Sequence, residues 1–306
     1  MNKQDYKKIV QELKERYEKI EADLKEYDSL LEKFKEDPSE SLKERIIELR
    51  QKIDKEMEEY EELGYVEYEG KKLFFKDAEF LEKYKGKIKE YNIENNFISK
   101  ITIPRRSEYI YHSGDLKKLK NLKELEIVGT SIKKLTSDKL PESIEVIYAG
   151  WCKNLKNYNL KNLNKLKKLN IEVTSIEELT YDKLPESIEE IDANQCKLKN
   201  YNLKNLNKLK KLNIEDTAIE ELTYDKLPES IEAIYAYHCE NLTKCSLKNL
   251  KNLKKLDISY SYFGIKKLGP EDIPESLQKL VVSIDQDMSE IKKDPRFKNL
   301  IIEVKK

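Results

Sequence analysis

The sequence predicts a mixed α/β chain in which an all-α helical hairpin precedes a solenoid of short parallel strands. Two patterns lead to this prediction. A heptad of apolar residues runs through residues 1–64, and a different apolar pattern recurs about every 22 residues from residue 97 onward. Composition agrees with both, because a chain with 39% charged and 38% hydrophobic residues can bury a core only where its apolar residues are periodic.

The heptad predicts two helices separated at Asp37-Pro38-Ser39, where the proline breaks the first and the serine can open the second. The stripe positions are Tyr6, Val10, Leu13, Tyr17, Ile20, Leu24, Tyr27, Leu31 and Phe34, then Leu42, Ile46, Leu49, Ile53, Met57, Tyr60 and Leu63. They can pack within one chain as an antiparallel hairpin, or between chains as a dimer. The short link and the tyrosines at stripe positions favour the hairpin, and with it a monomer.

Residues 65–96 are expected to link the hairpin to the repeats and to cap them. Gly64 can end the second helix. Residues 65–75 alternate around Glu69-Gly70, as in a small β-hairpin, and residues 77–92 have the pattern of a short amphipathic helix.

The repeats alternate between two related half-units. Residues 158–172 and 201–215 both read YNLKNLNKLKKLNIE. One half-unit, LxxLxIxxTxI, is seen at Leu166, Leu169, Ile171, Thr174 and Ile176. The other, IxxIxAxxCxxL, is seen at Ile144, Ile147, Ala149, Cys152 and Leu155.

This pattern resembles the leucine-rich repeat, whose signature is LxxLxLxxN/CxL. The resemblance implies a solenoid over residues 97–306 with about ten parallel strands on its concave face and Leu/Ile side chains directed inward. The alternation also resembles the repeats of plant intracellular immune receptors. The recurring LPES phrase resembles repeats of secreted bacterial effector ligases, although neither likeness extends beyond the repeats. Non-consensus strands are expected at Ile98–Ile103 and near Phe297, Leu300 and Ile302.

Little in the sequence suggests catalysis, so no enzyme activity, cofactor or metal is expected. There are 2 histidines, and no phosphate loop, HExxH, GxGxxG or GxSxG motif is present. Cys152, Cys196 and Cys239 recur about every two half-units, so we expect buried, reduced thiols at an inward turn rather than a zinc or disulfide site.

Charge and hydropathy bear on the environment and partners. The net charge of +0 argues against a general nucleic-acid binder, and no apolar run is long enough for a membrane span. The amino terminus lacks a signal-peptide core, so the protein is expected in the cytoplasm, or outside the cell if a signal is missing from this sequence. Abundant Lys, Asn and Ile indicate an AT-rich genome.

Comparison between repeats separates scaffold from candidate recognition residues. Tyr158 and Tyr201 are repeated and are assigned to the scaffold. Unrepeated residues on or beside the predicted strands are candidates for binding a partner: Tyr148, Trp151, Asp192, Asn194, Tyr235, Tyr237, His238, Tyr260, Tyr262 and Phe263. Between them, Glu172 and Glu215 contribute to a mildly acidic stretch that suits basic groups.

The function predicted from these residues is a non-enzymatic module that recognises a protein through its concave face. The resemblance implies an effector-like or adaptor protein of a host-associated microbe. The alternative is a structural protein that assembles through its heptad helices, with the repeats as a spacer.

Overall fold

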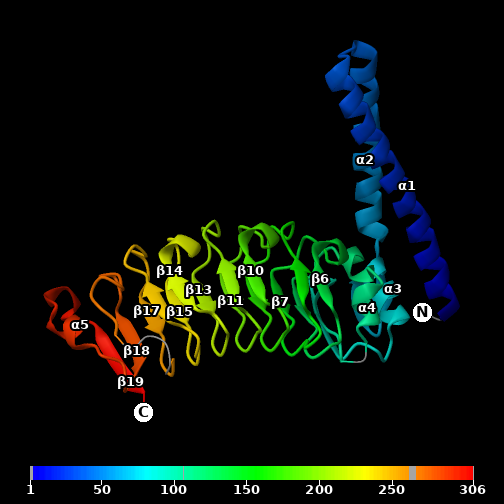
Figure 1. Ribbon diagram of the computed structural model, residues 1–306. Coiled ribbons are helices and arrows are strands. Elements are labelled where there is room, and N and C mark those ends of the chain that lie inside the picture. Colours follow the sequence, from blue (N-terminus) through cyan, green and yellow to red (C-terminus); the bar gives the residue numbers. More distant parts are fainter. Residues whose placement is uncertain (1–2, 106, 262–266, 306) are drawn as a thin grey trace. The chain divides into compact units, whose positions relative to one another are not determined.

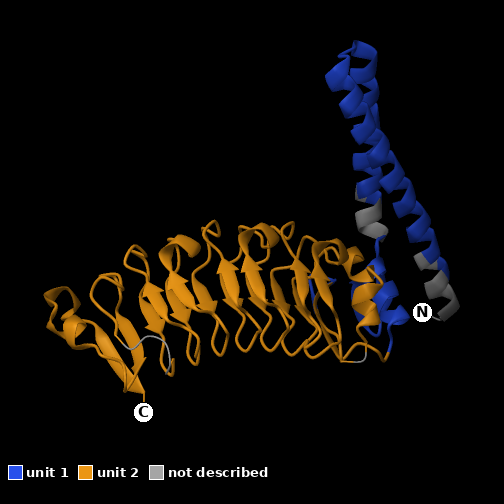
Figure 2. Cartoon of the chain, viewed as in Figure 1, with its two compact units in different colours: residues 1–85, 93–97 blue, residues 86–92, 98–306 orange. Residues whose placement is uncertain are grey.

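The computed structural model describes residues 3–105, 107–261 and 267–305 (Figure 1). The chain divides into two compact units, one of residues 1–85 and 93–97 and the other of residues 86–92 and 98–306 (Figure 2). Within the described part of the chain, no helix has the length and apolarity needed to cross a bilayer.

The first unit contains the predicted helical hairpin, formed by α1 (Lys3–Glu36) and α2 (Glu40–Leu63). Leu30, Leu49 and Ile53 are buried together between the helices. Ser39 caps α2, because its Oγ accepts a hydrogen bond from the Leu42 amide at 3.3 Å. The predicted stripe is therefore buried only in part within one chain. Leu13, Tyr17, Ile20, Leu49 and Ile53 are buried, but Leu24 is 37% exposed, and Leu30 is buried in place of the expected Leu31.

Ion pairs beside the apolar contacts link the two antiparallel helices. Lys52 Nζ lies 2.7 Å from Asp23 Oδ2, and Arg45 Nη2 lies 2.8 Å from Glu26 Oε1. Pairs of this kind contribute at most about 1 kcal/mol each when exposed, so the buried stripe supplies most of the stability.

A small β-hairpin and one helix complete the first unit. β1 (Tyr65–Tyr68) pairs antiparallel with β2 (Lys71–Phe74), and α3 (Phe75–Lys83) follows directly. Glu69 and Gly70 form the turn with φ of 49° and 78°, as the alternation predicts. The helix expected at 77–92 is shorter than predicted. It ends at Lys83, and Glu90 already begins a strand whose residues alternate in burial with period two.

The second unit is built on an 11-stranded sheet. Its strands in spatial order are β3 (Glu90–Glu94), β4 (Phe97–Thr102), β5 (Glu124–Glu126), β7 (Val146–Tyr148), β9 (Lys168–Asn170), β11 (Glu190–Asp192), β13 (Lys211–Asn213), β15 (Ala233–Tyr235), β17 (Lys255–Asp257), β18 (Lys279–Ser283) and β19 (Ile301–Lys305). From β4 onward all neighbours are parallel. The strand β3 comes in addition to those that the repeats predict, because no repeat motif marks it.

The core is a stack of inward Leu and Ile side chains, one from each strand of the sheet from β4 to β18. In register they run Ile101, Leu125, Ile147, Leu169, Ile191, Leu212, Ile234, Leu256 and Leu280, and each is at most 2% exposed. Each repeat buries its apolar residues only against its neighbours, so the array is stable as a stack and not as separate units. This is the leucine-rich repeat fold.

A second set of short parallel strands, which the sequence analysis did not anticipate, lies on the return path of each repeat. β6 (Lys134–Thr136) pairs with β8 (Asn157–Asn159), β10 (Glu178–Thr180) with β12 (Asn200–Asn202), and β14 (Glu221–Thr223) with β16 (Lys244–Ser246). The 3₁₀ turns η2 (Ser137–Lys139), η3 (Tyr181–Lys183) and η4 (Tyr224–Lys226) follow β6, β10 and β14.

Tyrosine hydroxyls bridge the breaks between these strand pairs. The Tyr158 hydroxyl accepts a hydrogen bond from the Thr180 amide at 2.9 Å, and the Tyr201 hydroxyl accepts one from the Thr223 amide at 3.1 Å. Burial raises the pKa of Tyr158 to about 12, so this phenol stays neutral. The assignment of both tyrosines to the scaffold is confirmed. Cys245 stands in the same register on β16.

The remaining elements lie at the two ends of the array. α4 (Tyr109–His112) and η1 (Asp115–Lys118) precede β5, and α5 (Ser289–Lys293) and η5 (Pro295–Phe297) precede β19. The buried rings of Tyr111 and Phe297 join the apolar stack there.

The cysteines lie where the repeat predicts. All four are free and buried. Cys196 Sγ donates to the Ile171 carbonyl at 3.0 Å and contacts Thr174 Oγ1 at 3.1 Å, and Cys152 and Cys239 repeat this arrangement. Burial raises the pKa of all three of these thiols. No cluster of potential metal ligands is found among the residues that the structure describes.

Candidate functional site

We call the solvent-facing side of the 11-stranded sheet the open face; it is the predicted concave face. Because side chains alternate along a strand, the first and third residues of each three-residue strand point to it while the middle one enters the core. Across strands β11, β13, β15 and β17 the third positions read Asp192, Asn213, Tyr235 and Asp257 in register.

Each strand of the sheet from β5 to β17 is followed by one residue in a left-handed conformation. Trp151, Val173, Gln195, Asp216, His238 and Tyr260 have φ between 51° and 61°, and Gly129 occupies the same position with a φ of 69°. The geometry is held by the next repeat, since the Trp151 amide donates to the Glu172 carbonyl at 2.8 Å. Large side chains in this strained conformation cost about 1–2 kcal/mol each, so folding of the repeat does not require them at this position.

Three rings that follow β15 and β17 form one cluster. The centroids of Tyr237 and His238 lie 4.4 Å apart, and those of Tyr237 and Tyr260 lie 5.0 Å apart. His238 stacks on Tyr260 at 5.2 Å with an interplanar angle of 14°. All three rings are half-buried, so a preorganised aromatic surface remains open to solvent.

Tyr235 lies on β15 between two lysines of the neighbouring strands. Lys255 Nζ is 4.5 Å from the ring centroid and 3.2 Å from the hydroxyl, and Lys211 Nζ is 5.6 Å from the centroid. The sequence analysis missed these lysines. The sequence contained a pattern that could have identified them, because lysine recurs at the first position of alternate strands, next to the strand that carries the unrepeated Tyr235.

Trp151 and Tyr148 lie four strands from Tyr235, at roughly 19 Å for a strand spacing of about 4.8 Å. They are 47% and 36% exposed. Trp151 Nε1 donates to Glu172 Oε1 at 3.2 Å. A hollow of about 170 Å³ begins at Tyr148 and extends past Asn170 and Asp192 to Asn213.

Carboxylates between the two aromatic groups are poorly compensated. Burial and the charge of Glu172 raise the pKa of Asp192. Burial, together with the charges of Asp257 and Asp192, raises the pKa of Glu215, and Lys255 only partly opposes this. Burial and mutual repulsion therefore both disfavour the ionised forms of these two carboxylates.

The structure thus gathers most of the predicted site residues on one face, in two groups. Tyr235, Tyr237, His238 and Tyr260 lie together, and Tyr148 and Trp151 lie apart from them, with Asp192 and Asn194 between. Tyr262 and Phe263 lie outside the described residues.

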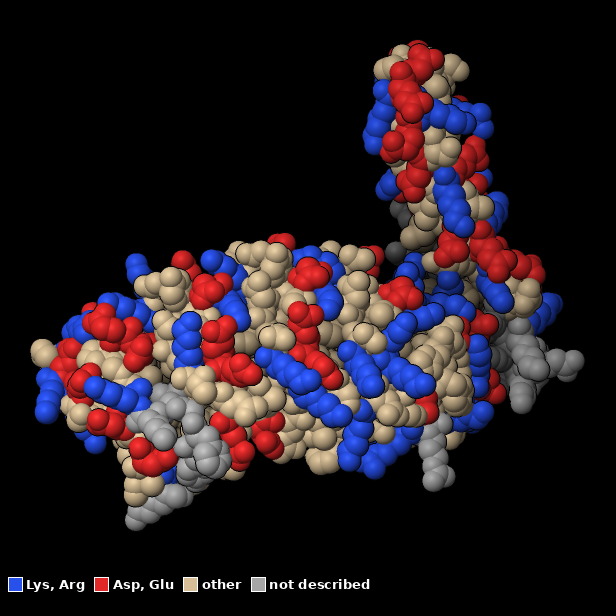
Figure 3. Space-filling view, viewed as in Figure 1, with Lys and Arg blue, Asp and Glu red and all other residues tan. Residues whose placement is uncertain are grey.

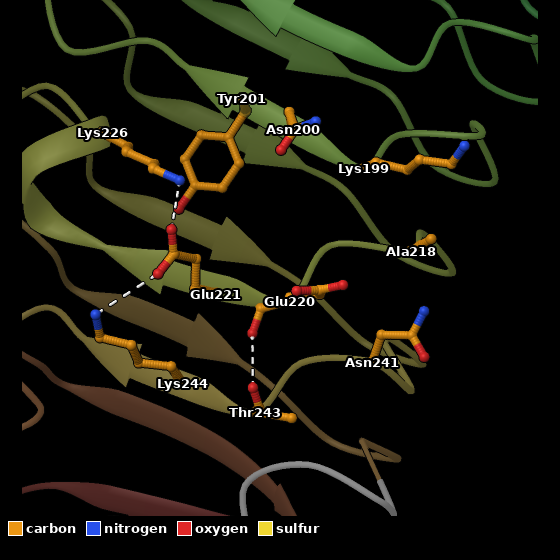
Figure 4. A pocket seen from close by; sticks show the side chains of 10 residues that line it. All are labelled: Lys199, Asn200, Tyr201, Ala218, Glu220, Glu221, Lys226, Asn241, Thr243 and Lys244. Atoms are coloured by element: carbon orange, nitrogen blue, oxygen red, sulfur yellow. Dashed lines mark hydrogen bonds and ion pairs between the residues drawn. The ribbon is translucent and has the colours of Figure 1, made fainter.

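A larger hollow of about 580 Å³ lies on the return path, between β12 and β14 (Figure 4). Glu221 pairs there with Lys226, and with Lys244 at 3.6 Å, so its charges are already satisfied. Tyr201, Glu221 and Lys226 recur in the preceding repeat as Tyr158, Glu178 and Lys183, which identifies this hollow as scaffold. Basic and acidic side chains are also interspersed over the side of the array shown in Figure 3.

Fold and sequence together define a leucine-rich repeat protein with an N-terminal helical hairpin. No protein-family model matches the sequence, and no curated protein matches it. Solved structures do resemble it. YopM from Yersinia enterocolitica aligns over 61% of this chain and 38% of its own, with 21% identity and a TM-score of 0.48.

Two further structures are similar. YopM from Yersinia pestis, described as a leucine-rich effector protein, aligns over 69% of this chain and 57% of its own, with 21% identity and a TM-score of 0.41. The functional domain of InlJ from Listeria monocytogenes aligns over 60% of this chain and 49% of its own, with 16% identity and a TM-score of 0.39. The chain spans less than two thirds of each of these proteins. Similarity at this level concerns the fold, not a partner.

Proposed function

We propose that this protein is a non-enzymatic interaction module that binds a protein partner through the open face of its sheet. The observation that carries the proposal is the cluster of Tyr237, His238 and Tyr260. These rings are unrepeated, two of them occupy strained backbone positions, and they pack on one another instead of entering the core. Aromatic residues fixed in this way are typical centres of protein interfaces.

An effector-like or adaptor role is part of the same proposal, supported by the resemblance of the LPES repeats to those of bacterial effectors. The assembly alternative has less support. Leu49 and Ile53, two stripe residues that would join two chains, are buried with Leu30 between α1 and α2 of one chain.

The proposal is tested by capturing the partner with the intact protein and then measuring its affinity for purified variants. Tyr235→Ala and Tyr237→Ala should each weaken binding by about 1–2 kcal/mol, because hot-spot side chains carry most of the binding energy. Their melting temperatures should stay close to wild type, since neither ring lies in the core.

Tyr224→Ala is the matched control, because Tyr224 is 43% exposed but lies on η4, away from the open face. If Tyr224→Ala or a deletion of residues 1–64 abolishes binding while Tyr235→Ala and Tyr237→Ala bind like wild type, the open face is not the binding surface.

A further inference from the structure

Rings and carboxylates lie side by side on the open face at the end of strands β13, β15 and β17. Across these strands, Asn213, Tyr235 and Asp257 are in register. Two residues further along each chain segment, Glu215 lies next to Tyr237. One residue later, Asp216 lies next to His238, since the Asp216 amide donates to the Tyr237 carbonyl at 2.8 Å. We call Glu215, Asp216, Tyr237, His238, Asp257 and Tyr260 the exit patch.

The carboxylates of the exit patch are not held in close ion pairs within the described part of the chain. Glu215, Asp216 and Asp257 form no ion pair with any residue in the described part of the chain. The lysines of the same strands are engaged elsewhere, as Lys211 and Lys255 both lie against the Tyr235 ring. Lys255 interacts electrostatically with Glu215, and Lys305 with Asp257, but neither lysine closes an ion pair with these carboxylates. The carboxylates therefore remain able to accept hydrogen bonds from a partner's cations.

A tyrosine on the same face shows that its rings can contact cationic groups. Tyr235 already holds two ammonium groups of the protein, at 4.5 and 5.6 Å from its centroid. Cations bind over aromatic faces, and guanidinium groups do so while donating to carboxylates in a planar fork. In the exit patch, Glu215 lies beside Tyr237 and Asp216 beside His238, each carboxylate one strand from a ring at a spacing of about 4.8 Å, which matches this combination.

Resting on the proposed function, we infer that the partner contacts the exit patch with an extended, arginine-containing segment of its chain. Arginine side chains of that segment stack on Tyr237, His238 and Tyr260 and donate to Glu215 and Asp257. An anionic partner such as nucleic acid meets carboxylates of the same charge and is repelled. The partner is thereby narrowed from any protein to one with an exposed basic segment.

The experiment uses fluorescence anisotropy of labelled twelve-residue peptides at physiological ionic strength, with the full-length protein. The probes are an Arg-Ser repeat, a Lys-Ser repeat and a Glu-Ser repeat. The Arg-Ser peptide should bind tightest, the Lys-Ser peptide more weakly and the Glu-Ser peptide not at all. An oligothymidine probe that binds better than the Arg-Ser peptide overturns the inference.

Variants locate the binding. Glu215→Gln with Asp257→Asn should weaken the Arg-Ser peptide at least tenfold, and Tyr237→Leu should weaken it while keeping apolar area. Glu229→Gln and Tyr224→Leu, at exposed positions elsewhere, are controls that should leave affinity unchanged. Circular dichroism confirms that each variant is folded. Unchanged affinity in the exit-patch variants, or equal loss in the controls, overturns the inference.

The outcome is separable from that of the proposed function. One outcome is that the captured natural partner loses affinity with Tyr237→Leu but not with Glu215→Gln and Asp257→Asn. In that case the open face binds the partner, and the inference that the partner uses a basic segment is wrong. If the natural partner is insensitive to all three substitutions, the open-face proposal fails as well.

Discussion

Removing the Tyr201 hydroxyl tests how the array closes the gaps between its return strands. Tyr201 and Thr223 are each 4% exposed, and the Thr223 amide has the Tyr201 hydroxyl as its partner at 3.1 Å. Tyr201→Phe deletes one oxygen, keeps the ring and leaves the amide buried without an acceptor. A buried, unpaired N–H costs about 1–3 kcal/mol.

Urea unfolding followed by far-ultraviolet circular dichroism measures this cost directly. Tyr201→Phe should lower the free energy of unfolding by about 1–3 kcal/mol. Tyr224→Phe, at an exposed tyrosine just beyond Thr223, should change it by less than about 0.5 kcal/mol. Amide exchange adds a local readout, because the Thr223 amide should exchange faster in Tyr201→Phe while the Thr180 amide does not.

Two results would refute the reasoning. One is a Tyr201→Phe protein as stable as Tyr224→Phe. The other is a destabilised protein in which the Thr223 amide exchanges at the wild-type rate, because the loss would then arise from something other than the bridging hydrogen bond.

Further predictions concern the core, the backbone, the thiols and pH. Leu169→Ala should lose about 2–5 kcal/mol in the same urea assay, because it opens a cavity in the stack. Val173→Asn should gain up to about 1 kcal/mol, since a β-branched residue is strained at a φ of 52°. Thiol labelling with iodoacetamide should reach Cys196 only after unfolding, because burial raises its pKa and shields it. Burial raises the pKa of Asp192 in the folded protein above its unfolded value. Ionisation of Asp192 therefore destabilises the folded protein as pH rises through that interval. Asp192→Asn should consequently gain stability relative to wild type from pH 4 to pH 7, as urea midpoints would show.

Most of the fold follows from two periods in the sequence. Leu125, Leu169 and Leu212 recur so regularly that the strands of the open face from β5 to β17 can be placed from the sequence alone. The heptad similarly predicts the hairpin, and its residues Leu49 and Ile53 are buried against the first helix, although their partner there is Leu30 and not the expected Leu31.

What the sequence did not reveal depends on pairing across repeats. The return strands are three residues long and include Asn200 and Asn202, so their local pattern resembles a loop, and only the next repeat makes them strands. The strand at β3 was hidden for a similar reason, since its residues carry no repeat motif.

The candidate site was predictable in position but not in detail. Repeat comparison identified Tyr235 and Tyr237, because a position that varies between neighbouring repeats is free of scaffold constraints. It could not show that Lys211 and Lys255 lie against Tyr235, or that Asp216 lies beside His238. Those contacts arise from register between strands about 22 residues apart in sequence.

Site-specific photocrosslinking tests the central claim most directly. A benzophenone amino acid placed at Tyr237 in the full-length protein should form a covalent adduct with the partner, and the same group at Tyr224 or at the exposed Ile47 of α2 should not. An adduct at Tyr224 or Ile47, with none at Tyr237, would contradict binding through the open face of the sheet.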